Sequence, residues 1–392
     1  MDKTKDGRRF RARALVLTAV CAVLATLALL AAAVWLVFGK DGTAVLEGLF
    51  LVRTQYVGDD DSAAVADSAL SGLIDGVGDR WSYYLDPERY QAEQTRRENA
   101  YVGIGVTVDY TSGEGLRIRS VTPGGPAEAA GLQADEIITE ADGVSLAGDA
   151  RYDATDRIAG AEGTTVRLTV KGTDGALREV TVERKSIHTD PVSYEMLDGR
   201  VGYVALSNFF RGSEEAVKAA VEDLQSQGAR ALVFDMRNNG GGYLDELIPM
   251  LDDLLPEGTI FQTRSNVGRV KTYESDADGV DLPMAVLVNA DTYSAAEIFA
   301  AELQEKVGAA VVGVPTTGKG YSQILFPLTN GGAVGLSTAE YFTGEGVSLI
   351  GTGLTLDREV ALTDEDAAKQ KAGVLPKEED AQLQAALELL QS

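Results

Sequence analysis

The stretch A-R-A-L-V-F-D-M-R-N-N-G-G-G, residues 229–242, decides the fold. The mainly apolar residues 229–235 predict a buried strand, and the triple glycine after them predicts a tight loop. Two further short apolar runs, at 284–289 and 309–314, also predict strands. Predicted helices lie between them at 244–255 and 294–307. Strands that alternate with helices indicate an α/β core, in which parallel strands end at a common edge of one sheet.

Three loops follow the predicted strands and should therefore meet at that edge. They are R-N-N-G-G-G at 237–242, D-T-Y-S-A-A-E at 291–297 and P-T-T-G-K-G-Y-S-Q at 315–323. The first offers backbone N–H groups without obstructing side chains, the second a hydroxyl at a helix start, and the third a lysine between glycines. A nucleophile, a base and oxyanion donors are the parts that an acyl-transfer site requires.

Each part also has a purely structural interpretation. Ser294-Ala-Ala-Glu297 is a capping box, which occurs at many helix starts. Taken alone, Lys319 is interpreted as a solvated lysine in a turn, and Gly240–Gly242 as an ordinary turn. The single histidine, His188, lies in a predicted linker, so that a Ser-His-Asp triad would depend on an incidental residue. Only the combination of the three loops predicts catalysis.

Residues 313–319 also match the first seven positions of a phosphate-binding P-loop. Gly320 stands where that loop needs a serine or threonine for Mg²⁺. The following residues, 321–329, predict a strand rather than the helix whose N-terminus would hold phosphate. The sequence therefore disfavours nucleotide hydrolysis.

Composition excludes several other classes of function. One cysteine, Cys21, and one histidine cannot form an internal disulfide or the usual zinc and iron sites, so no cofactor or metal is expected. The formal charge of the 392 residues is −25, and residues 41–392 hold 58 acidic against 28 basic residues. So acidic a surface repels nucleic acid, which we do not expect as a partner.

The N-terminal segment predicts a membrane anchor. Residues 14–38 contain no charge, and a helix of 25 residues spans roughly 37 Å, more than the ~30 Å hydrocarbon core of a bilayer. The run is longer than the apolar part of a secretory signal, although cleavage stays open. A basic flank precedes it. We expect a single-pass protein of the cell membrane with a cytoplasmic N-terminus and an extracytoplasmic catalytic part.

The sequence resembles the C-terminal processing peptidases of the S41 serine protease family over residues 44–392. That family has Ser-Ala-x-Glu at a helix start and Gly-Lys-Gly-x-x-Gln with its lysine 25 residues after the serine. Ser294–Glu297 and Gly318–Gln323 show the same arrangement. Residues 101–106, Y-V-G-I-G-V, resemble the carboxylate-binding loop of a PDZ domain. Short alternating strands up to residue 187 agree with such a β-rich domain.

The resemblance implies roles for particular residues. Ser294 is the expected nucleophile, Lys319 the general base, and Gln323 the hydrogen-bonding partner that positions the lysine. A solvated lysine has a pKa of ~10.4, so burial must lower the pKa of Lys319 before it can accept a proton. The N–H groups of Gly241, in the glycine loop, and Ala295, directly after the nucleophile, are the expected oxyanion donors.

The expected fold is an α/β protease core with a mixed or parallel sheet, of the ClpP/crotonase-like kind found in S41 peptidases. The expected chain comprises a cytoplasmic tail and transmembrane anchor (1–40), an N-terminal helical segment (41–98), a PDZ domain (99–187), an S41 protease core (188–365) and a C-terminal helical segment (366–392). The helical residues 44–98 and 376–390 are able to pair between subunits, so a homo-oligomer is a further expectation.

The expected function is that of a membrane-anchored serine endopeptidase with a Ser-Lys dyad. Its substrates would be proteins or peptides with free C-termini, recognised by the PDZ domain. The N–H groups of Gly103, Ile104, Gly105 and Val106 would hold the terminal carboxylate while the peptide adds as a strand. The alternative is a catalytically silent PDZ scaffold at the cell surface.

Overall fold

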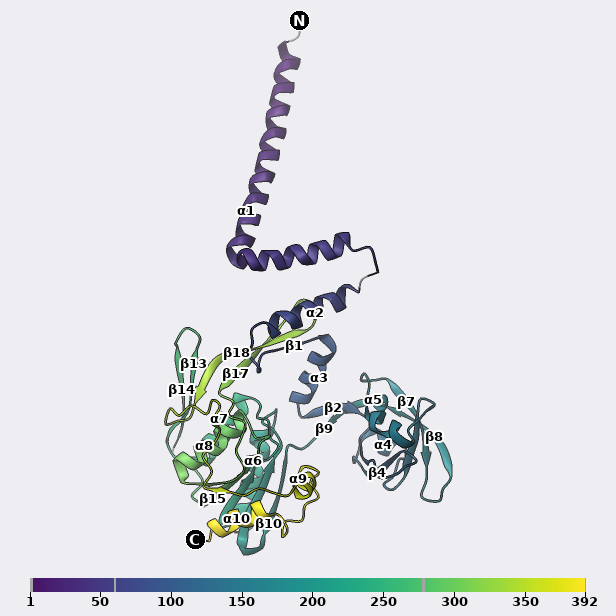
Figure 1. Cartoon of the computed structure of the whole chain (residues 1–392), viewed down its shortest axis with the longest axis vertical. Coiled ribbons are helices and arrows are strands. Elements are labelled where there is room, and N and C mark those ends of the chain that lie inside the picture. The colour runs from purple at the N-terminus through teal and green to yellow at the C-terminus, as the bar shows by residue number, and fades with distance from the viewer. Residues whose placement is uncertain (1–2, 60, 277–278, 392) are drawn as a thin grey trace. The chain divides into compact units, whose positions relative to one another are not determined.

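The computed structural model describes residues 3–59, 61–276 and 279–391, and it divides into two units that meet between Leu73 and Ile74. This break lies within residues 41–98, the expected N-terminal helical segment. Each unit is described by itself below (Figure 1).

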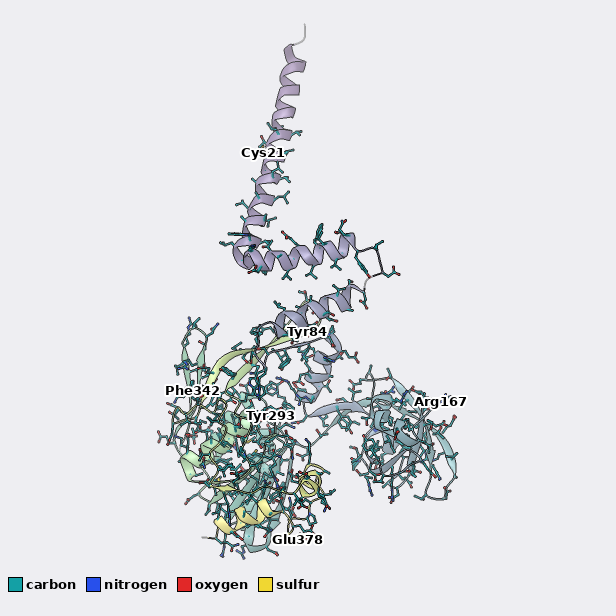
Figure 2. All side chains as sticks on the ribbon, in the orientation of Figure 1. Cys21, Tyr84, Arg167, Tyr293, Phe342 and Glu378 are labelled. Atoms are coloured by element: carbon teal, nitrogen blue, oxygen red, sulfur yellow. The ribbon has the colours of Figure 1, made fainter. Side chains whose placement is uncertain are left out.

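The first unit consists of α1 (Lys3–Gln55) and most of α2 (Ser62–Asp75). Gly39 has φ 66° and ψ −169°, which is not helical, and α1 bends there (Figure 1). The apolar run 14–38 therefore ends at the bend. From Leu15 on, α1 is long and apolar enough to cross a membrane by length and composition. Cys21 is exposed on this helix (Figure 2). The side chains of residues 1–14, including the basic flank, lie outside the described part.

The second unit is built around a six-stranded sheet. Its strands are β10 (Val192–Leu197), β11 (Val201–Leu206), β12 (Ala231–Asp235), β15 (Met284–Val288), β16 (Ala310–Gly313) and β19 (Arg358–Glu359), in that spatial order. The pair β10–β11 is antiparallel, and every later pair is parallel. The predicted mixed α/β sheet is confirmed.

Alternation along the central strands places helices on both faces of this sheet. Leu232 and Phe234 belong to a large core with α6 (Ser213–Ser226), α7 (Leu244–Leu254) and α8 (Ala295–Val307). Val233, which points the other way, packs with Leu383 of α10 (Ala381–Leu389). Such fully buried strands are near-continuous apolar runs, as the sequence shows.

Ion pairs join α10 to the end of β12, where the glycine loop begins. The Arg237 guanidinium donates three bonds to the carboxylate of Asp235, at 2.6, 2.9 and 3.1 Å, and two to that of Asp380, at 2.7 and 3.1 Å. All three side chains are buried. Asp380 also caps α10 by accepting from the N–H of Gln382 and Leu383. The loop that follows β12 is thus fixed at its first residue.

A second, antiparallel sheet includes a strand that begins directly after the lysine loop. It comprises β1 (Tyr83–Leu85), β13 (Gly258–Ser265), β14 (Val270–Ser275), β17 (Tyr321–Pro327) and β18 (Ala333–Phe342). β1 pairs with β18, and α3 (Pro87–Arg97) follows it with Asp86 as its N-cap. Residues 83–97 of the N-terminal segment therefore contribute a strand and a helix beside this second sheet.

A separate β domain is inserted between α3 and β10. Its strands are β3 (Val106–Asp109), β4 (Leu116–Val121), β5 (Ile137–Ala141), β6 (Val144–Ser145), β7 (Thr165–Lys171) and β8 (Leu177–Glu183), with short helices α4 (Pro126–Ala129) and α5 (Ala154–Ile158). It has its own apolar core. β2 (Ala100–Gly103) pairs with β9 (Lys185–His188), which brings the entry and exit of the domain together. A turn that contains Asp174 and Gly175 joins β7 to β8 in an antiparallel hairpin.

Candidate active site

Ser294 lies at a sharp turn between strand β15 and helix α8. It is the N-cap of α8, and its backbone has φ 62° and ψ −126°. A positive φ is uncommon for a residue with a side chain, and such strain is concentrated at functional sites. Thr292, just before it, donates from its hydroxyl to the carbonyl of Met236, at 2.8 Å. The serine turn is thus tied to the glycine loop.

The carboxylate of Glu297 joins the serine turn to the lysine loop. One oxygen accepts from the N–H groups of Ser294 and Lys319, at 3.1 and 3.0 Å. The other accepts from the N–H of Gly318 at 2.7 Å and the hydroxyl of Thr316 at 2.6 Å. Burial raises the pKa of Glu297, and these four hydrogen bonds oppose the rise. The sequence identified this residue only as part of a capping box.

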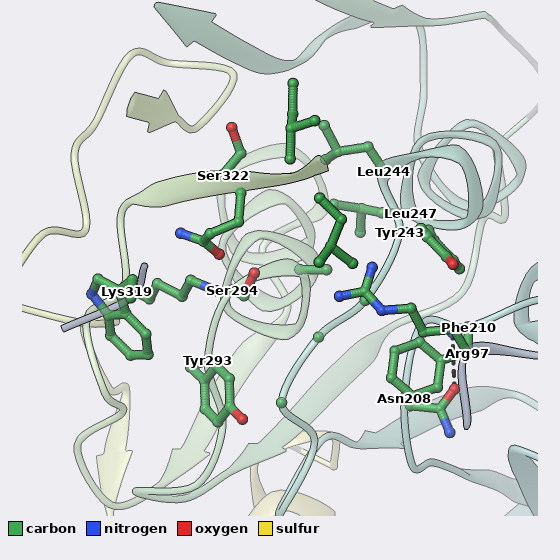
Figure 3. A pocket seen from close by; sticks show the side chains of 18 of the residues that line it. Arg97, Asn208, Phe210, Tyr243, Leu244, Leu247, Tyr293, Ser294, Lys319 and Ser322 are labelled. Atoms are coloured by element: carbon green, nitrogen blue, oxygen red, sulfur yellow. Dashed lines mark hydrogen bonds between the residues drawn. The ribbon is translucent and has the colours of Figure 1, made fainter. Parts of the chain in front are cut away.

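Lys319 points toward Ser294 from the opposite side of the site (Figure 3). Its Nζ lies 4.9 Å from the ring centroid of Trp81 and 5.9 Å from that of Tyr293. It forms no ion pair with any carboxylate of the described residues. Burial, assisted by the positive charge of Arg97, lowers the pKa of Lys319 to about 8, against opposing effects of Glu297 and Asp79. A substantial fraction of this lysine is therefore neutral near physiological pH.

Tyr341 of β18 completes the contact between the two loops. Its hydroxyl donates to the carbonyl of Lys319 and lies close to the side chain of Ser294. Burial raises its pKa well above the ordinary value, so it stays protonated. Sequence reasoning missed this residue, because nothing in the sequence places β18 beside the serine.

The glycine loop lies directly against the serine turn. A Cβ added to Gly241 would lie 2.7 Å from the nitrogen of Ala295 and 2.9 Å from the Cβ of Ser294, so no side chain fits there. Gly241 also has φ +83°, which favours glycine. Its N–H donates to Oδ1 of Asn239 at 2.8 Å. The N–H of Ala295, the first residue of α8, has no carbonyl one turn earlier within the helix.

Gln323 lies at an irregularity in the pairing of β17 with β18, between Ser322 and Gln323. A bulge of this kind redirects a side chain, and bulges are common beside active sites. Its Nε2 donates to the carbonyl of Tyr321 at 2.9 Å and to the hydroxyl of Ser337 at 3.0 Å. These bonds fix the amide group through its nitrogen. The amide oxygen is then the atom available to accept a hydrogen bond from Lys319.

One cleft of about 1000 Å³ collects these groups. Its lining includes Ser294, Lys319, Gln323, Gly241 and Ala295. The structure therefore brings together every residue of the predicted catalytic set. No group of three or more metal-binding side chains occurs within residues 3–59, 61–276 and 279–391.

The remaining candidates lie elsewhere. His188 is exposed on β9, outside the cleft lining. Gly103, Ile104, Gly105 and Val106 connect β2 to β3 in the β domain. The carbonyls of Ile104 and Gly105 accept from Ala127 and Thr122 at 2.8 and 2.9 Å, which fixes this loop beside helix α4.

Comparison with known proteins agrees with this arrangement. The model of peptidase family S41 matches residues 200–360, and a PDZ-domain model matches residues 117–172. A carboxyl-terminal-processing protease from Picosynechococcus sp. is 34% identical over 84% of this chain and 79% of its own length. A carboxy-terminal-processing protease from Bartonella bacilliformis is 33% identical over 78% of this chain and 72% of its own. The solved structure of a photosystem II D1 C-terminal processing protease, 27% identical, covers 85% of this chain and 92% of its own with a TM-score of 0.50.

Trp81 forms one wall of the surroundings of Lys319, and we expect its replacement by alanine to raise the pKa of the lysine from about 8 toward 10.5. Loss of the cation–π contact acts in the opposite direction, but by only ~0.5–1 kcal/mol. The present shift corresponds to roughly 3 kcal/mol of unfavourable desolvation, which is the larger effect. The rate at which acetic anhydride labels Lys319, followed by mass spectrometry across pH, reports this pKa.

Trp81→Phe keeps an aromatic wall and is the matched control. An unchanged or lower pKa in Trp81→Ala would show that the ring does not exclude water from the lysine.

Proposed function

The chain belongs to peptidase family S41, the carboxyl-terminal-processing serine proteases, and we propose that it cleaves its substrates with Ser294 as nucleophile and Lys319 as general base. One observation carries this proposal. A buried lysine without a carboxylate partner points at a serine that is held in a strained turn (Figure 3). This is the environment in which an amine gives up its proton and can activate a hydroxyl.

The proposed reaction has two steps. Neutral Lys319 takes the proton of the Ser294 hydroxyl while the oxygen attacks the peptide carbonyl, and the lysine then protonates the leaving amine. This leaves an acyl-enzyme on Ser294. The neutral lysine next takes a proton from a water molecule that attacks the ester, and returns this proton to the oxygen of Ser294 as the new C-terminus is released. Gln323, fixed by Tyr321 and Ser337, would present its amide oxygen to the lysine.

The oxyanion of the tetrahedral intermediate needs preorganised donors. The N–H of Ala295 is one, since it follows the nucleophile and lies at the positive end of α8. The N–H of Gly241 is the other proposed donor. Because it is bonded to Asn239 here, it can serve only after that bond is exchanged for one to substrate. Catalysis would then include a small movement of the glycine loop.

The PDZ domain would supply substrate selection. The loop from Gly103 to Val106 leads into β3, which lies at the end of its sheet next to β4, so its outer edge can accept an added peptide strand. The peptide's terminal carboxylate would be held by backbone N–H groups of this loop. Substrates would thus be proteins or peptides with free C-termini.

Replacing Ser294 or Lys319 by alanine should lower kcat on an unfolded protein substrate by at least about 10³-fold, because each group is indispensable to the same step. The double variant should be no slower than either single variant, since the two act as a unit. His188→Ala is the control and should keep full activity. A folded His188→Ala protein without activity would overturn the dyad. A wild-type protein no faster than Ser294→Ala would also overturn it, and would favour a silent PDZ scaffold.

The pH dependence follows from the pKa of about 8 for Lys319. The base works only when neutral, so log kcat/KM should rise with a slope near +1 below pH 8 and level off above it. Each pH unit below this pKa then costs about tenfold in rate. Rates in solutions of raised viscosity serve as the control that chemistry limits turnover. A flat profile from about pH 6 to 9 under those conditions would contradict lysine as base.

We also propose that residues 14–38 anchor the chain in the cell membrane, with the catalytic part on the extracytoplasmic side. The helix is apolar and exposed along this run. Alkaline carbonate should leave the full chain in the membrane fraction, and protease added outside intact cells should digest residues after 41. Release by carbonate, or a product that begins after residue 38, would show that the segment does not remain as an anchor.

A further inference from the structure

Arg97 is a charged residue of the catalytic cleft that takes no direct part in the proposed chemistry, although its charge helps to lower the pKa of Lys319. It is the last residue of α3, and it lines the same cleft as Ser294 and Lys319. In Figure 3 its guanidinium points into the cleft from the right of the view, whereas Lys319 enters from the left. The cleft therefore has a cation on the side of the serine opposite the base.

The guanidinium is held in place, yet its outer nitrogens have only neutral partners. Nε donates to a carboxylate oxygen of Glu93 at 2.6 Å. The terminal nitrogens face the phenol groups of Tyr83, at 3.5 Å, and Tyr243, above whose ring the cation lies at 5.3 Å. Among the residues that the structure describes, no carboxylate bonds these two nitrogens. They form the planar fork that matches a carboxylate.

The local charge is positive although the protein is acidic. Glu93 is shared by two arginines, because Arg96 donates to it at 2.8 Å while Arg97 does so at 2.6 Å. One carboxylate thus faces two guanidinium groups. Side-chain exposure is only 24% for Arg97 and 15% for Glu93. A half-buried cation that is not fully neutralised attracts an anionic ligand.

Apolar side chains also line the cleft. Leu244, at the start of α7, directly follows Tyr243, above whose ring Arg97 lies. Tyr273, Ile324 and Leu325 line the same cleft and are at least partly exposed. A ligand that fits both surfaces carries an anionic end and apolar side chains, as a peptide with an apolar C-terminal residue does.

We infer that Arg97 binds the C-terminal carboxylate of the substrate inside the catalytic cleft, with the apolar end of the peptide against Leu244. The inference rests on the proposed Ser-Lys protease and names its substrate class. The fragment released with the new amine is then the one whose carboxylate Arg97 holds. Cleavage therefore occurs at a short, fixed distance from the end of the chain.

This site is separate from the carboxylate loop at residues 103–106. One peptide end can occupy only one of them at a time. The loop would retain the tail of a substrate, and the cleft would hold the end during cleavage. An experiment on Arg97 must therefore measure binding or cleavage in the cleft without a contribution from the PDZ domain.

The kinetic test compares a short fluorogenic peptide with an apolar C-terminal residue, as the free acid and as the C-terminal amide. For the wild-type chain we expect kcat/KM to be about 10- to 100-fold higher for the acid, the range of a charge-assisted hydrogen bond. In Arg97→Gln, kcat/KM for the free-acid peptide should fall to the value for the amide, and kcat/KM for the amide should stay unchanged. Assays at about pH 9.5, above the pKa of Lys319, remove any effect of Arg97 on the base.

Two variants are matched controls. Arg97→Lys keeps the charge but loses the planar fork, and should retain an intermediate preference for the acid. Arg89→Gln changes an exposed arginine on the same helix, outside the cleft lining, and should behave as wild type. Equal slowing of both peptides by Arg97→Gln, or an unchanged ratio, would overturn the inference.

A binding test does not depend on turnover. Trp35 and Trp81 are the only tryptophans, and Trp81 lines the cleft. In the full chain carrying Trp35→Phe and Ser294→Ala, fluorescence therefore reports the cleft and not the PDZ domain. The free acid should bind at least tenfold more tightly than the amide, and Arg97→Gln should abolish this difference; equal affinities in the first protein would refute carboxylate binding by Arg97.

Two patterns of results distinguish failure of the proposed protease chemistry from failure of the proposed carboxylate site. Binding that depends on Arg97 without any peptide cleavage would reject the proposed protease chemistry and retain the carboxylate site. Cleavage that depends on Ser294 and Lys319 but treats acid and amide alike would retain the protease and reject the site. Calorimetry on the Arg97→Gln, Ser294→Ala chain reads the PDZ domain, where a remaining preference for the acid supports the loop at 103–106 and equal affinities contradict it.

Discussion

The buried carboxylate of Glu297 is the constraint on which the rest of the site depends. It accepts four hydrogen bonds, from the backbone of Ser294, Gly318 and Lys319 and from the hydroxyl of Thr316. Because the serine and lysine loops follow different strands, their separation would otherwise vary with every small shift of the sheet. A single group bonded to both backbones fixes that separation. The anion remains without an ion pair to the lysine, so the amine is free to lose its proton.

Desolvation of Lys319 comes from a part of the chain that lies far away in sequence. Trp81 precedes β1, which pairs with β18 of the second sheet, and its ring lies 6.0 Å from that of Tyr293. The base is thus enclosed by the segment before the PDZ domain and by the serine loop together. The same segment brings Arg97 to the cleft at the end of α3. Any movement of residues 80–97 would change both the hydration of the base and the charge facing the substrate.

Much of the fold and part of the site could be predicted because they follow local rules. Strands 231–235, 284–288 and 310–313 are apolar runs bounded by glycine, asparagine or aspartate, and parallel strands must end at one edge. The convergence of Gly241, Ser294 and Lys319 follows from that rule. Other features of the site could not be read in this way. Tyr341, Trp81 and Arg97 reach the cleft through pairings between strands, or through a helix, distant in sequence, and no local pattern specifies them.

The sequence by itself determined the order of elements, the three loops at the sheet edge and the spacing of Ser294 and Lys319, since periodicity and motif spacing are properties of the chain. Tertiary structure alone decided whether those side chains could react. The pKa of Lys319 depends on which groups exclude water around it and which charges face it, and the bond from Gly241 to Asn239 depends on how one loop packs. Dielectric surroundings and hydrogen-bond partners arise from packing in three dimensions, so they are absent from any one-dimensional pattern.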